Sequence, residues 1–396
     1  MKNKFYGLPD VLKTPSLYLL LGIISLTSWL LFAPAASNVF LAAGLQQHRS
    51  PKQSGLMLDT ARRFYLVRTI KDFIDDLAES GGTFLHLHFS DHENYALESK
   101  LLGQSVQDAV RGADGTYINP NTGKPFLSFA QLRDITAYAA AKKIEIVPEV
   151  GSPNHMGGIF SLLEHKHGKA YTDALKSPRA ADEININNPK SVALVKALID
   201  EVAGAFGKNS RHFHIGGDEF GYSPESNHEF IRYANTLAEY LAKKRLTTRM
   251  WNDGLIKTTA GSLNRNIQIT YWSYDGNPAD RDTARKRRAI RMSMPELIEK
   301  GFSVLNYNSY YLYLVPQGHN FSHDIDFARN DIEKRWNLGV WDGENRENAV
   351  ENTDKILGAA LAIWGENSGK LDTDTIRKYA AKPLASVIRK TREADR

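Results

Sequence analysis

Short apolar segments alternate with longer segments of helical spacing from Gly55 onward. The spacing of Ile70, Phe73, Ile74 and Leu77, for example, predicts a helix that two glycines end. The segments read as strands are residues 55–58, 83–89, 144–150, 213–216, 249–253, 267–272, 304–307 and 359–364. Alternating strands and helices are typical of a parallel sheet, and eight such strands predict a single (β/α)8 barrel. In that fold, active sites gather at the carboxyl ends of the strands.

One predicted strand runs directly into two acidic residues, within residues 212–222. A regular strand would point Asp218 and Glu219 to opposite faces, but Gly216 and Gly217 allow the chain to turn there. Two adjacent carboxyl groups suit a division of labour, in which one is a neutral proton donor and the other stays ionised to orient a substrate. Taken alone, the dipeptide is more typical of a solvated turn. The residues at the other strand ends must therefore decide between a solvated turn and a catalytic pair.

Charged and aromatic residues also follow the other predicted strands. They include Arg62, Asp91, His155, Trp251, Trp272, Tyr311 and Glu366. With Trp364, three tryptophans stand at strand ends, and their flat apolar rings suit the apolar face of a sugar or an acetamido methyl group. Any single tryptophan is more typical of core packing, but three at one rim favour a pocket. Arg62 and Glu366 could hydrogen-bond hydroxyl groups there.

The segment 212–222 resembles the catalytic stretch of glycoside hydrolase family 20, the β-N-acetylhexosaminidases. Further segments resemble a biofilm-dispersing member of that family: 85–94, 153–155, 251–254, 271–276, 306–313 and 364–366. The resemblance covers Gly55 to about Lys390. It implies retaining, substrate-assisted hydrolysis without a cofactor, in which the 2-acetamido oxygen of the substrate attacks the anomeric carbon and forms an oxazolinium-like intermediate.

The resemblance also implies roles for individual residues. Glu219 would be the general acid and then the base, while Asp218 would orient the acetamido nitrogen. Tyr311 or Tyr313 would hydrogen-bond the acetamido oxygen, and Tyr313 is slightly favoured. The residues implied for the pocket walls and the ring hydroxyls are Trp251, Trp272, Trp364, Arg62, Asp280 and Glu366. The residues expected to support the acid or to contact a polymer at the rim are Asp91, His155, Tyr222 and Tyr274.

The implied substrate is β-1,6-linked poly-N-acetylglucosamine, a biofilm exopolysaccharide. Chitobiase-like cleavage of β-1,4-linked oligomers and a non-catalytic carbohydrate-binding barrel are the alternatives. Gly151 departs from the family, which commonly has an aspartate there, so a hydrogen bond behind the catalytic pair is in doubt. We expect no accessory N-terminal domain of the kind common in the family, because few residues separate the hydrophobic leader from the first strand.

Two histidine pairs, His86 with His88 and His212 with His214, each place two imidazoles on one strand face. Such pairs would suit a metal-dependent hydrolase or deacetylase. No third ligand is evident in the sequence, and substrate-assisted hydrolysis needs no metal. We therefore expect hydrogen-bonded histidines in the barrel interior and no metal site.

The first 47 residues are expected to direct export, and residues 48–396 to form the catalytic barrel. Three lysines precede a stretch without charged residues that extends to Arg49, and Ala33-Pro34-Ala35 resembles a cleavage site. Residues 15–43 are also long enough for a membrane anchor. The formal charge of +5 includes +2 from the first 13 residues and shows no basic cluster, so no nucleic-acid partner is expected. We expect a monomer, and the absence of cysteine excludes disulfides.

Overall fold

The computed structural model describes residues 51–317, 321–366, 368–369 and 371–395. The predicted leader, residues 1–47, lies outside this part of the chain. Among the described residues, no helix combines the length and the apolar character that a membrane span requires.

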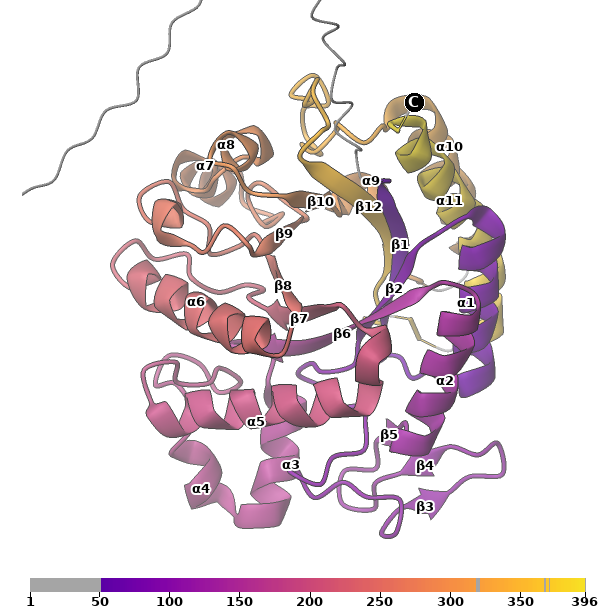
Figure 1. Cartoon of the computed structure of the whole chain (residues 1–396), viewed down its shortest axis with the longest axis vertical. Coiled ribbons are helices and arrows are strands. Elements are labelled where there is room, and N and C mark those ends of the chain that lie inside the picture. Colours follow the sequence, from indigo (N-terminus) through magenta and orange to yellow (C-terminus); the bar gives the residue numbers. More distant parts are fainter. Residues whose placement is uncertain (1–50, 318–320, 367, 370, 396) are drawn as a thin grey trace, which may run out of the picture. The chain divides into compact units, whose positions relative to one another are not determined.

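Eight parallel strands close into a barrel, as the sequence predicts (Figure 1). In order around the barrel they are β1 (Gln53–Asp59), β2 (Phe84–His88), β6 (Glu145–Ser152), β7 (His212–Gly216), β8 (Thr247–Trp251), β9 (Gln268–Tyr271), β10 (Val304–Asn306) and β12 (Ile356–Ile363). Strand β12 pairs with β1 in parallel and completes the ring. The short strand β11 (Tyr313–Leu314) also pairs with β12. A closed barrel leaves no free edge, and it brings the carboxyl ends of all eight strands to one rim.

Helices surround the barrel. They are α1 (Val67–Ser80), α2 (Phe129–Ala141), α3 (Gly157–His167), α4 (Lys169–Asp173), α5 (Pro189–Phe206), α6 (Asn227–Lys243), α7 (Arg281–Ile290), α8 (Met294–Glu299), α9 (Ser309–Leu312), α10 (Phe321–Arg335) and α11 (Thr373–Glu393). The predicted helix at Ile70 to Leu77 is α1, which ends at Gly81 in the left-handed conformation (φ 80°). A small antiparallel sheet of β3 (Val110–Arg111), β4 (Tyr117–Ile118) and β5 (Pro125–Phe126) forms where the sequence indicates only a polar loop.

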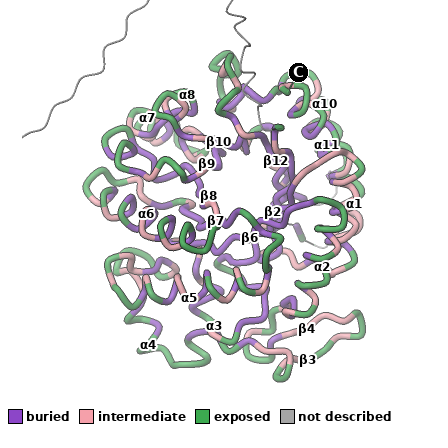
Figure 2. The backbone as a smooth tube through the Cα atoms, viewed as in Figure 1, coloured by how far each residue is buried: buried purple, intermediate pink, exposed green. Residues whose placement is uncertain are grey.

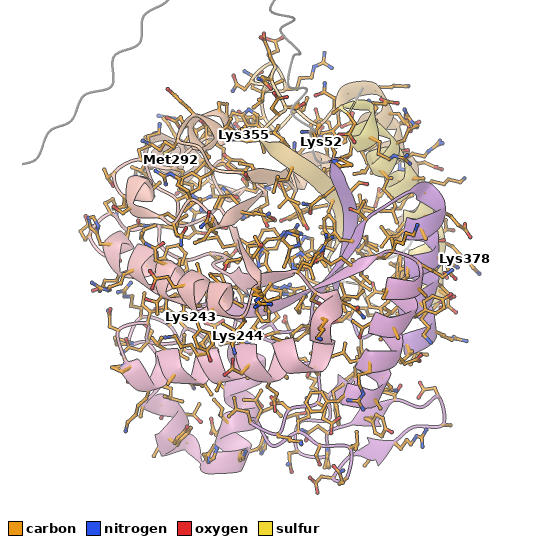
Figure 3. All side chains as sticks on the ribbon, viewed as in Figure 1. Lys52, Lys243, Lys244, Met292, Lys355 and Lys378 are labelled. Carbon is orange, nitrogen blue, oxygen red and sulfur yellow. The ribbon has the colours of Figure 1, made fainter. Side chains whose placement is uncertain are left out.

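Apolar side chains pack on both faces of the barrel wall. One cluster joins the strands to the helices and includes Leu56, Phe73 and Leu198, and a smaller one contains Met57, Val147 and other strand residues. The strands are buried, whereas the helices expose their outer faces (Figure 2). Side chains fill the ring of strands, and Lys378 projects outward from α11 (Figure 3). The inside of the barrel is therefore a packed core, and any site must lie at its rim.

Candidate active site

The chain turns sharply after β7, at the two glycines. Gly216 and Gly217 have φ angles of 80° and 90°, and a Cβ atom at Gly216 would lie 2.6 Å from the backbone nitrogen of Ser152. Glu219 also lies in the left-handed region, with a φ of 49°, which is uncommon for a residue with a side chain. The turn leaves the Asp218 side chain 23% exposed and the Glu219 side chain 56% exposed. Glu219 therefore reaches the solvent at the rim, whereas Asp218 is largely covered.

His155 connects this turn to the loop after β2. Its Nε2 atom lies 3.4 Å from Glu219 Oε2 and 3.9 Å from Asp218 Oδ2. Its Nδ1 atom lies 3.2 Å from Asp91 Oδ1. Burial alone would lower the pKa of His155, but its hydrogen bonds to Asp91 and Glu219 raise the pKa to about 11. His155 is therefore an imidazolium ion between carboxylates, and the structure brings together four of the predicted site residues.

The two carboxyl groups of the turn have different affinities for protons. Burial, together with the negative charge of Asp253, raises the pKa of Asp218 well above its usual value. The hydrogen bond with His155 lowers the pKa of Glu219. These shifts favour a proton on Asp218 over one on Glu219, although the family resemblance assigns the acid role to Glu219. A substrate must change this distribution before Glu219 can donate a proton.

The structure separates the two candidate tyrosines. The ring of Tyr313 stacks on Trp272 at 6.0 Å with an interplanar angle of 9°. The Tyr313 ring also lies 5.4 Å from the Trp364 ring, so Tyr313 belongs to the aromatic group that contains both tryptophans. Burial, with the charge of Asp218, raises the pKa of Tyr313 well above its usual value. Tyr311 lies in α9, which packs against α10, and burial together with the charge of Asp331 in α10 raises its pKa.

Aromatic rings form the wall and the floor of the site. Trp364 lies 5.4 Å from Tyr313 and 6.1 Å from Trp251, measured between ring centroids. Trp251 is completely buried, and its Nε1 donates a hydrogen bond to Glu149 Oε1 at 2.8 Å. Trp251 therefore lies in the floor, below a wall of Trp272, Tyr313 and Trp364.

Arg62 is surrounded by carboxylates at the same rim. It forms ion pairs with Asp59 at 3.0 Å and with Asp91 at 2.8 Å, and it lies 3.8 Å from Glu366. Its guanidinium carbon lies 5.4 Å from the centre of the Trp364 ring. The Glu366 side chain is 42% exposed, so its carboxylate is accessible at the rim beside Arg62.

Asp280 is not brought together with these residues. It is exposed and caps the N-terminus of α7, where its side chain accepts hydrogen bonds from the backbone nitrogens of Asp282 at 3.3 Å and Thr283 at 2.8 Å. In this conformation, its carboxylate is used by its own helix rather than by a sugar hydroxyl group.

Asp253 is a site residue that the sequence analysis missed. It is completely buried, and it accepts hydrogen bonds from the Tyr222 hydroxyl at 2.9 Å and from Trp272 Nε1 at 2.6 Å. Arg291 also donates to it at 3.0 Å and lies against the Tyr222 ring. Asp253 thus holds one wall of the site, and Tyr222 is directed toward this network. In the sequence, Asp253 could have been recognised as a site residue by its position at the carboxyl end of a strand, next to Asn252.

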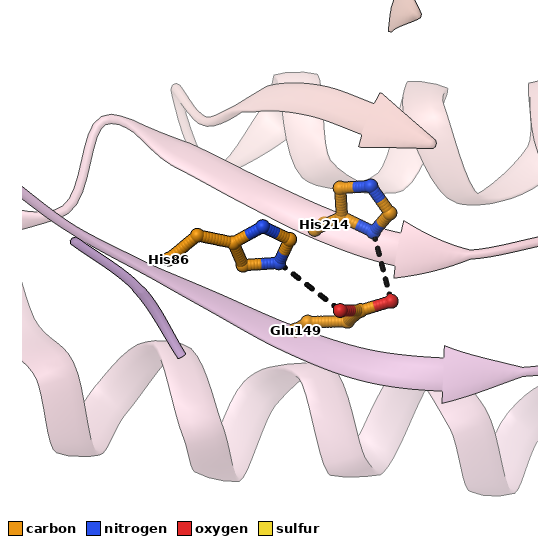
Figure 4. Close-up of side chains that lie close together, drawn as sticks. All are labelled: His86, Glu149 and His214. Atoms are coloured by element: carbon orange, nitrogen blue, oxygen red, sulfur yellow. Dashed lines mark ion pairs between the residues drawn. The ribbon is translucent and has the colours of Figure 1, made fainter. Parts of the chain in front are cut away.

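The structure corrects the expectation that the histidine pairs lack a third ligand. Glu149 of β6 lies between His86 and His214, whose nitrogens are 3.0 Å and 3.1 Å from its carboxylate (Figure 4). These three buried groups lie within 4.8 Å of one another and could hold a metal ion. The same carboxylate also receives hydrogen bonds from Trp251 and His88. A single sequence does not reveal this cluster, because a lone glutamate inside a strand has no visible partner.

The departure at Gly151 lies next to the catalytic turn. A Cβ atom at Gly151 would lie 3.3 Å from the carbonyl oxygen of Ser90, which is a tight contact. Any larger side chain at this position would therefore need a small shift of the loop that carries Asp91.

A cavity of about 740 Å³ adjoins the aromatic wall. It shares Trp272 with the site, and Tyr274, Tyr310, Arg281 and Arg285 are among its lining residues. The catalytic pair does not line it. Its position beside the wall would allow a long ligand to extend away from the catalytic turn.

Comparison with known proteins identifies similar chains. Residues 52–379 match the family model described as glycosyl hydrolase family 20, catalytic domain. The crystal structure of dispersin B is 59% identical, with a TM-score of 0.84, over 86% of this chain and 99% of that chain. A chitobiase structure from Flavobacterium johnsoniae is 19% identical, with a TM-score of 0.58, over 86% of this chain and 48% of that one, and shows the fold alone.

Curated relatives are more distant. A lacto-N-biosidase from Bifidobacterium bifidum is 26% identical over 69% of this chain, and a β-hexosaminidase from Akkermansia muciniphila is 26% identical over 82% of it. The chain spans 23% of the length of the first and 65% of the length of the second.

Proposed function

Because the chain belongs to glycosyl hydrolase family 20 and is a glycosidase of the β-N-acetylhexosaminidase type, we propose that its substrate is β-1,6-linked poly-N-acetylglucosamine. The resemblance of its strand-end segments implies this exopolysaccharide. The 59% identity with dispersin B over 99% of that chain supports the proposal. The observation that carries the mechanism is the position of Asp218, Glu219 and Tyr313 at one end of the barrel.

The substrate would supply its own nucleophile. Its acetamido oxygen attacks the anomeric carbon while the bond from that carbon to the leaving oxygen breaks, and Glu219 gives a proton to the leaving oxygen. Asp218 accepts a hydrogen bond from the acetamido nitrogen, and the Tyr313 hydroxyl donates one to the acetamido oxygen. Water then opens the oxazolinium-like intermediate, and Glu219 takes back a proton. The configuration at the anomeric carbon is retained.

Substrate binding would also redistribute the shared proton. The acetamido N–H donates to Asp218 and favours the ionised form of that carboxyl group, because a hydrogen bond to a carboxylate lowers its pKa. The sugar at the same time covers Glu219, and loss of water favours its neutral form. Binding would thus shift the preference for the shared proton from Asp218 toward Glu219, where the leaving oxygen needs it.

The walls of the site would select the sugar. Trp272, Tyr313 and Trp364 offer flat apolar surface to the pyranose ring and to the acetamido methyl group. Arg62 and Glu366 offer charged hydrogen-bonding groups for the ring hydroxyls. A polymer would continue over the rim toward the cavity that Tyr274 lines.

The test is product analysis with the full-length chain. The protein is given β-1,6-linked and β-1,4-linked N-acetylglucosamine oligomers in parallel, with Glu219→Gln as the control. We expect cleavage of the β-1,6 oligomers and its loss in the control. Preferred cleavage of the β-1,4 oligomers would instead assign the chain to chitin-fragment turnover. Cleavage of neither would contradict the proposal.

We also propose that the chain is exported and that residues 48–396 act outside the cytoplasm, as a secreted monomer or as one anchored through residues 15–43. The basic start, the uncharged stretch and the small-residue motif of the leader support export. Cell fractionation followed by N-terminal sequencing separates the two cases, because only a cleaved chain starts after the leader. Recovery of the intact chain in the cytoplasm would refute export.

A further inference from the structure

A continuous series of charged contacts leads from the barrel interior to Glu219. It begins at Glu149, whose Oε2 atom lies 2.6 Å from His88 Nδ1. His88 Nε2 lies 2.8 Å from Asp91 Oδ2. Asp91 Oδ1 lies 3.2 Å from His155 Nδ1, and His155 Nε2 lies 3.4 Å from Glu219 Oε2. Three carboxylates thus alternate with two imidazoles. His88 forms hydrogen bonds through both of its nitrogens, whereas His155 forms one through Nδ1 and faces Glu219 through Nε2 at the distance of an ion pair.

The inner part of this series is deeply buried. The side chains of His88 and Glu149 are 3% and 1% exposed, and that of Asp91 is 2% exposed. A buried carboxylate is costly unless hydrogen-bond donors surround it. A backbone carbonyl could accept from the second nitrogen of His88 at lower cost, yet this nitrogen binds Asp91, the same carboxylate that binds His155. His88 therefore holds Asp91 Oδ2 from the barrel interior, and Arg62 contacts the same oxygen at 2.8 Å from the rim.

The charges along the series alternate in sign. Burial alone would lower the pKa of His88, but the charge of Glu149 and the hydrogen bonds with Asp91 and Glu149 raise it well above its usual value, and Asp59 adds to this. Burial alone would raise the pKa of Glu149, but the neighbouring His214 and His88 lower it well below its usual value. Each imidazolium ion thus lies between two carboxylates.

We propose that His88 and Glu149 are positioning residues of the hydrolysis, which hold Asp91 and His155 in the orientation that Glu219 needs. This inference rests on the proposed role of Glu219. His88 acts through Asp91 and His155, and neither His88 nor Glu149 touches the substrate. Glutamine at position 149 can still accept the hydrogen bond of Trp251 Nε1, so that the floor of the sugar site is retained. The His88 ring lies 5.3 Å from the Trp364 ring, so His88→Gln also removes one contact of the wall. In both variants Asp91 loses support from the interior, and His155 becomes free to turn away from Glu219.

The same carboxylate could serve a different purpose. Glu149 lies beside His86 and His214, and a metal ion held by these three groups would make Glu149 a ligand rather than the end of the series. A bound metal ion would compete with His88 for the Glu149 carboxylate. Metal content therefore distinguishes the two roles.

The test compares Glu149→Gln and His88→Gln with His212→Gln. His212 makes a matched control, because it also pairs with a buried glutamate of β6 and has no contact with Asp91, His155 or Glu219. A general acid contributes roughly 100- to 10,000-fold to a rate, so partial loss of its positioning should lower kcat about 10- to 100-fold. We expect that loss in Glu149→Gln and His88→Gln with KM within about twofold of wild type. The control should keep its kcat.

The pH profile supplies a readout that a structural role would not change. Glu219 faces the positive charges of His155, Arg62 and Arg287. Further from Glu219, His88 adds a positive charge and Glu149 a negative one. Removing the positive charge of His88 should move the acid limb of kcat/KM to higher pH, and removing the negative charge of Glu149 should move it to lower pH. The double variant should return toward the wild-type profile.

A second readout does not depend on activity. In protein labelled with ¹⁵N-histidine, the imidazole N–H signal of His155 should shift in Glu149→Gln and His88→Gln and stay in place in His212→Gln. An unchanged His155 signal would overturn the inference even if no substrate is cleaved, whereas a shifted signal with an inactive wild type would contradict only the proposed function. Equal kcat losses in all three variants, or a stoichiometric metal ion whose removal abolishes activity, would also overturn it.

Discussion

Strand β6 carries two buried glutamates, and the difference between them shows how the barrel separates stability from chemistry. Glu145 at its amino end binds His212 of β7, with 2.9 Å between Oε1 and Nδ1. Glu149 lies four residues further along the same strand, nearer the rim. It binds His88 of β2, with 2.6 Å between Oε2 and Nδ1. The two pairs consist of the same residue types on the same sheet.

Their surroundings shift the pKa values of the two histidines in opposite directions. Burial and the positive charge of Arg249 lower the pKa of His212, although Glu145 acts to raise it. His88 lies between Glu149 and Asp91 and keeps its proton. The pair Glu145–His212 therefore has arginines as its further neighbours and holds strands together. The pair Glu149–His88 is connected through Asp91 and His155 to Glu219. This agrees with the general division of labour between the two faces of such barrels.

The largest effect should come from Glu219→Gln. The amide cannot donate or accept the proton of the leaving oxygen, so kcat should fall about 100- to 10,000-fold, while the melting temperature stays close to wild type. Steady-state kinetics on a chromogenic β-N-acetylglucosaminide and thermal unfolding measure both. A variant that keeps its turnover would show that Glu219 is not the general acid. The difference between Glu145 and Glu149 would then have no link to the reaction.

The next effect concerns the two tyrosines of one short segment. Tyr313→Phe removes the hydroxyl that donates to the acetamido oxygen, and kcat should fall about 100-fold, since loss of one such donor typically costs 100- to 1,000-fold. Tyr311→Phe should change kcat less than about twofold, because Tyr311 lies in α9, which packs against α10. The reverse result from the same kinetic assay would exchange their roles.

Glu145→Gln should act on stability instead of turnover. Burial alone would raise the pKa of Glu145, but hydrogen bonding with His212 lowers it to about 2 from an unfolded value of 4.5. The stabilisation by its charge is therefore present above pH 4.5 and is lost as the pH falls through about 2. Urea unfolding should show a loss of about 1–3 kcal/mol near pH 7 that shrinks toward pH 2, with kcat unchanged. A loss that is independent of pH would point to packing alone.

A smaller effect is expected from Asp253→Asn, as a shift of the pH profile. After burial, the negative charge of Asp253 is the largest influence that raises the pKa of Asp218. Without that charge the shared proton leaves the pair at lower pH, so the alkaline limb of kcat/KM should move to lower pH. An alkaline limb that does not move would show that burial alone sets the proton affinity of Asp218.

The smallest effect should come from Asp280→Ala. Its carboxylate caps α7, so the variant should show a slightly lower melting temperature and a KM within about twofold of wild type. Asp280→Asn, which can still cap the helix, should be closer to wild type in both. A tenfold rise of KM in both variants would instead restore Asp280 as a group that binds a ring hydroxyl.

The apolar pattern was sufficient to predict the barrel, because each of its eight strands is a short buried run between helices. It also predicted the rim on which Asp91, His155, Asp218 and Glu219 meet, since parallel strands end at the same side. Tyr311 and Tyr313 could not be separated, because they lie two residues apart and the change from α9 to β11 between them decides their directions.

Glu149 and Asp253 were missed for a different reason. Each acquires its role from partners on other strands, and the register between strands is not visible in a single sequence. Asp280 shows the opposite limit, because a matching motif position does not reveal that the side chain turns back onto its own helix.

The comparison of the two glutamates of β6 is tested most directly by measuring kcat and the melting temperature of Glu149→Gln and Glu145→Gln side by side. The account predicts that Glu149→Gln lowers kcat about 10- to 100-fold in the fraction that remains folded, while Glu145→Gln lowers the melting temperature and keeps kcat. Equal losses of kcat in both variants, or none in Glu149→Gln, would contradict it.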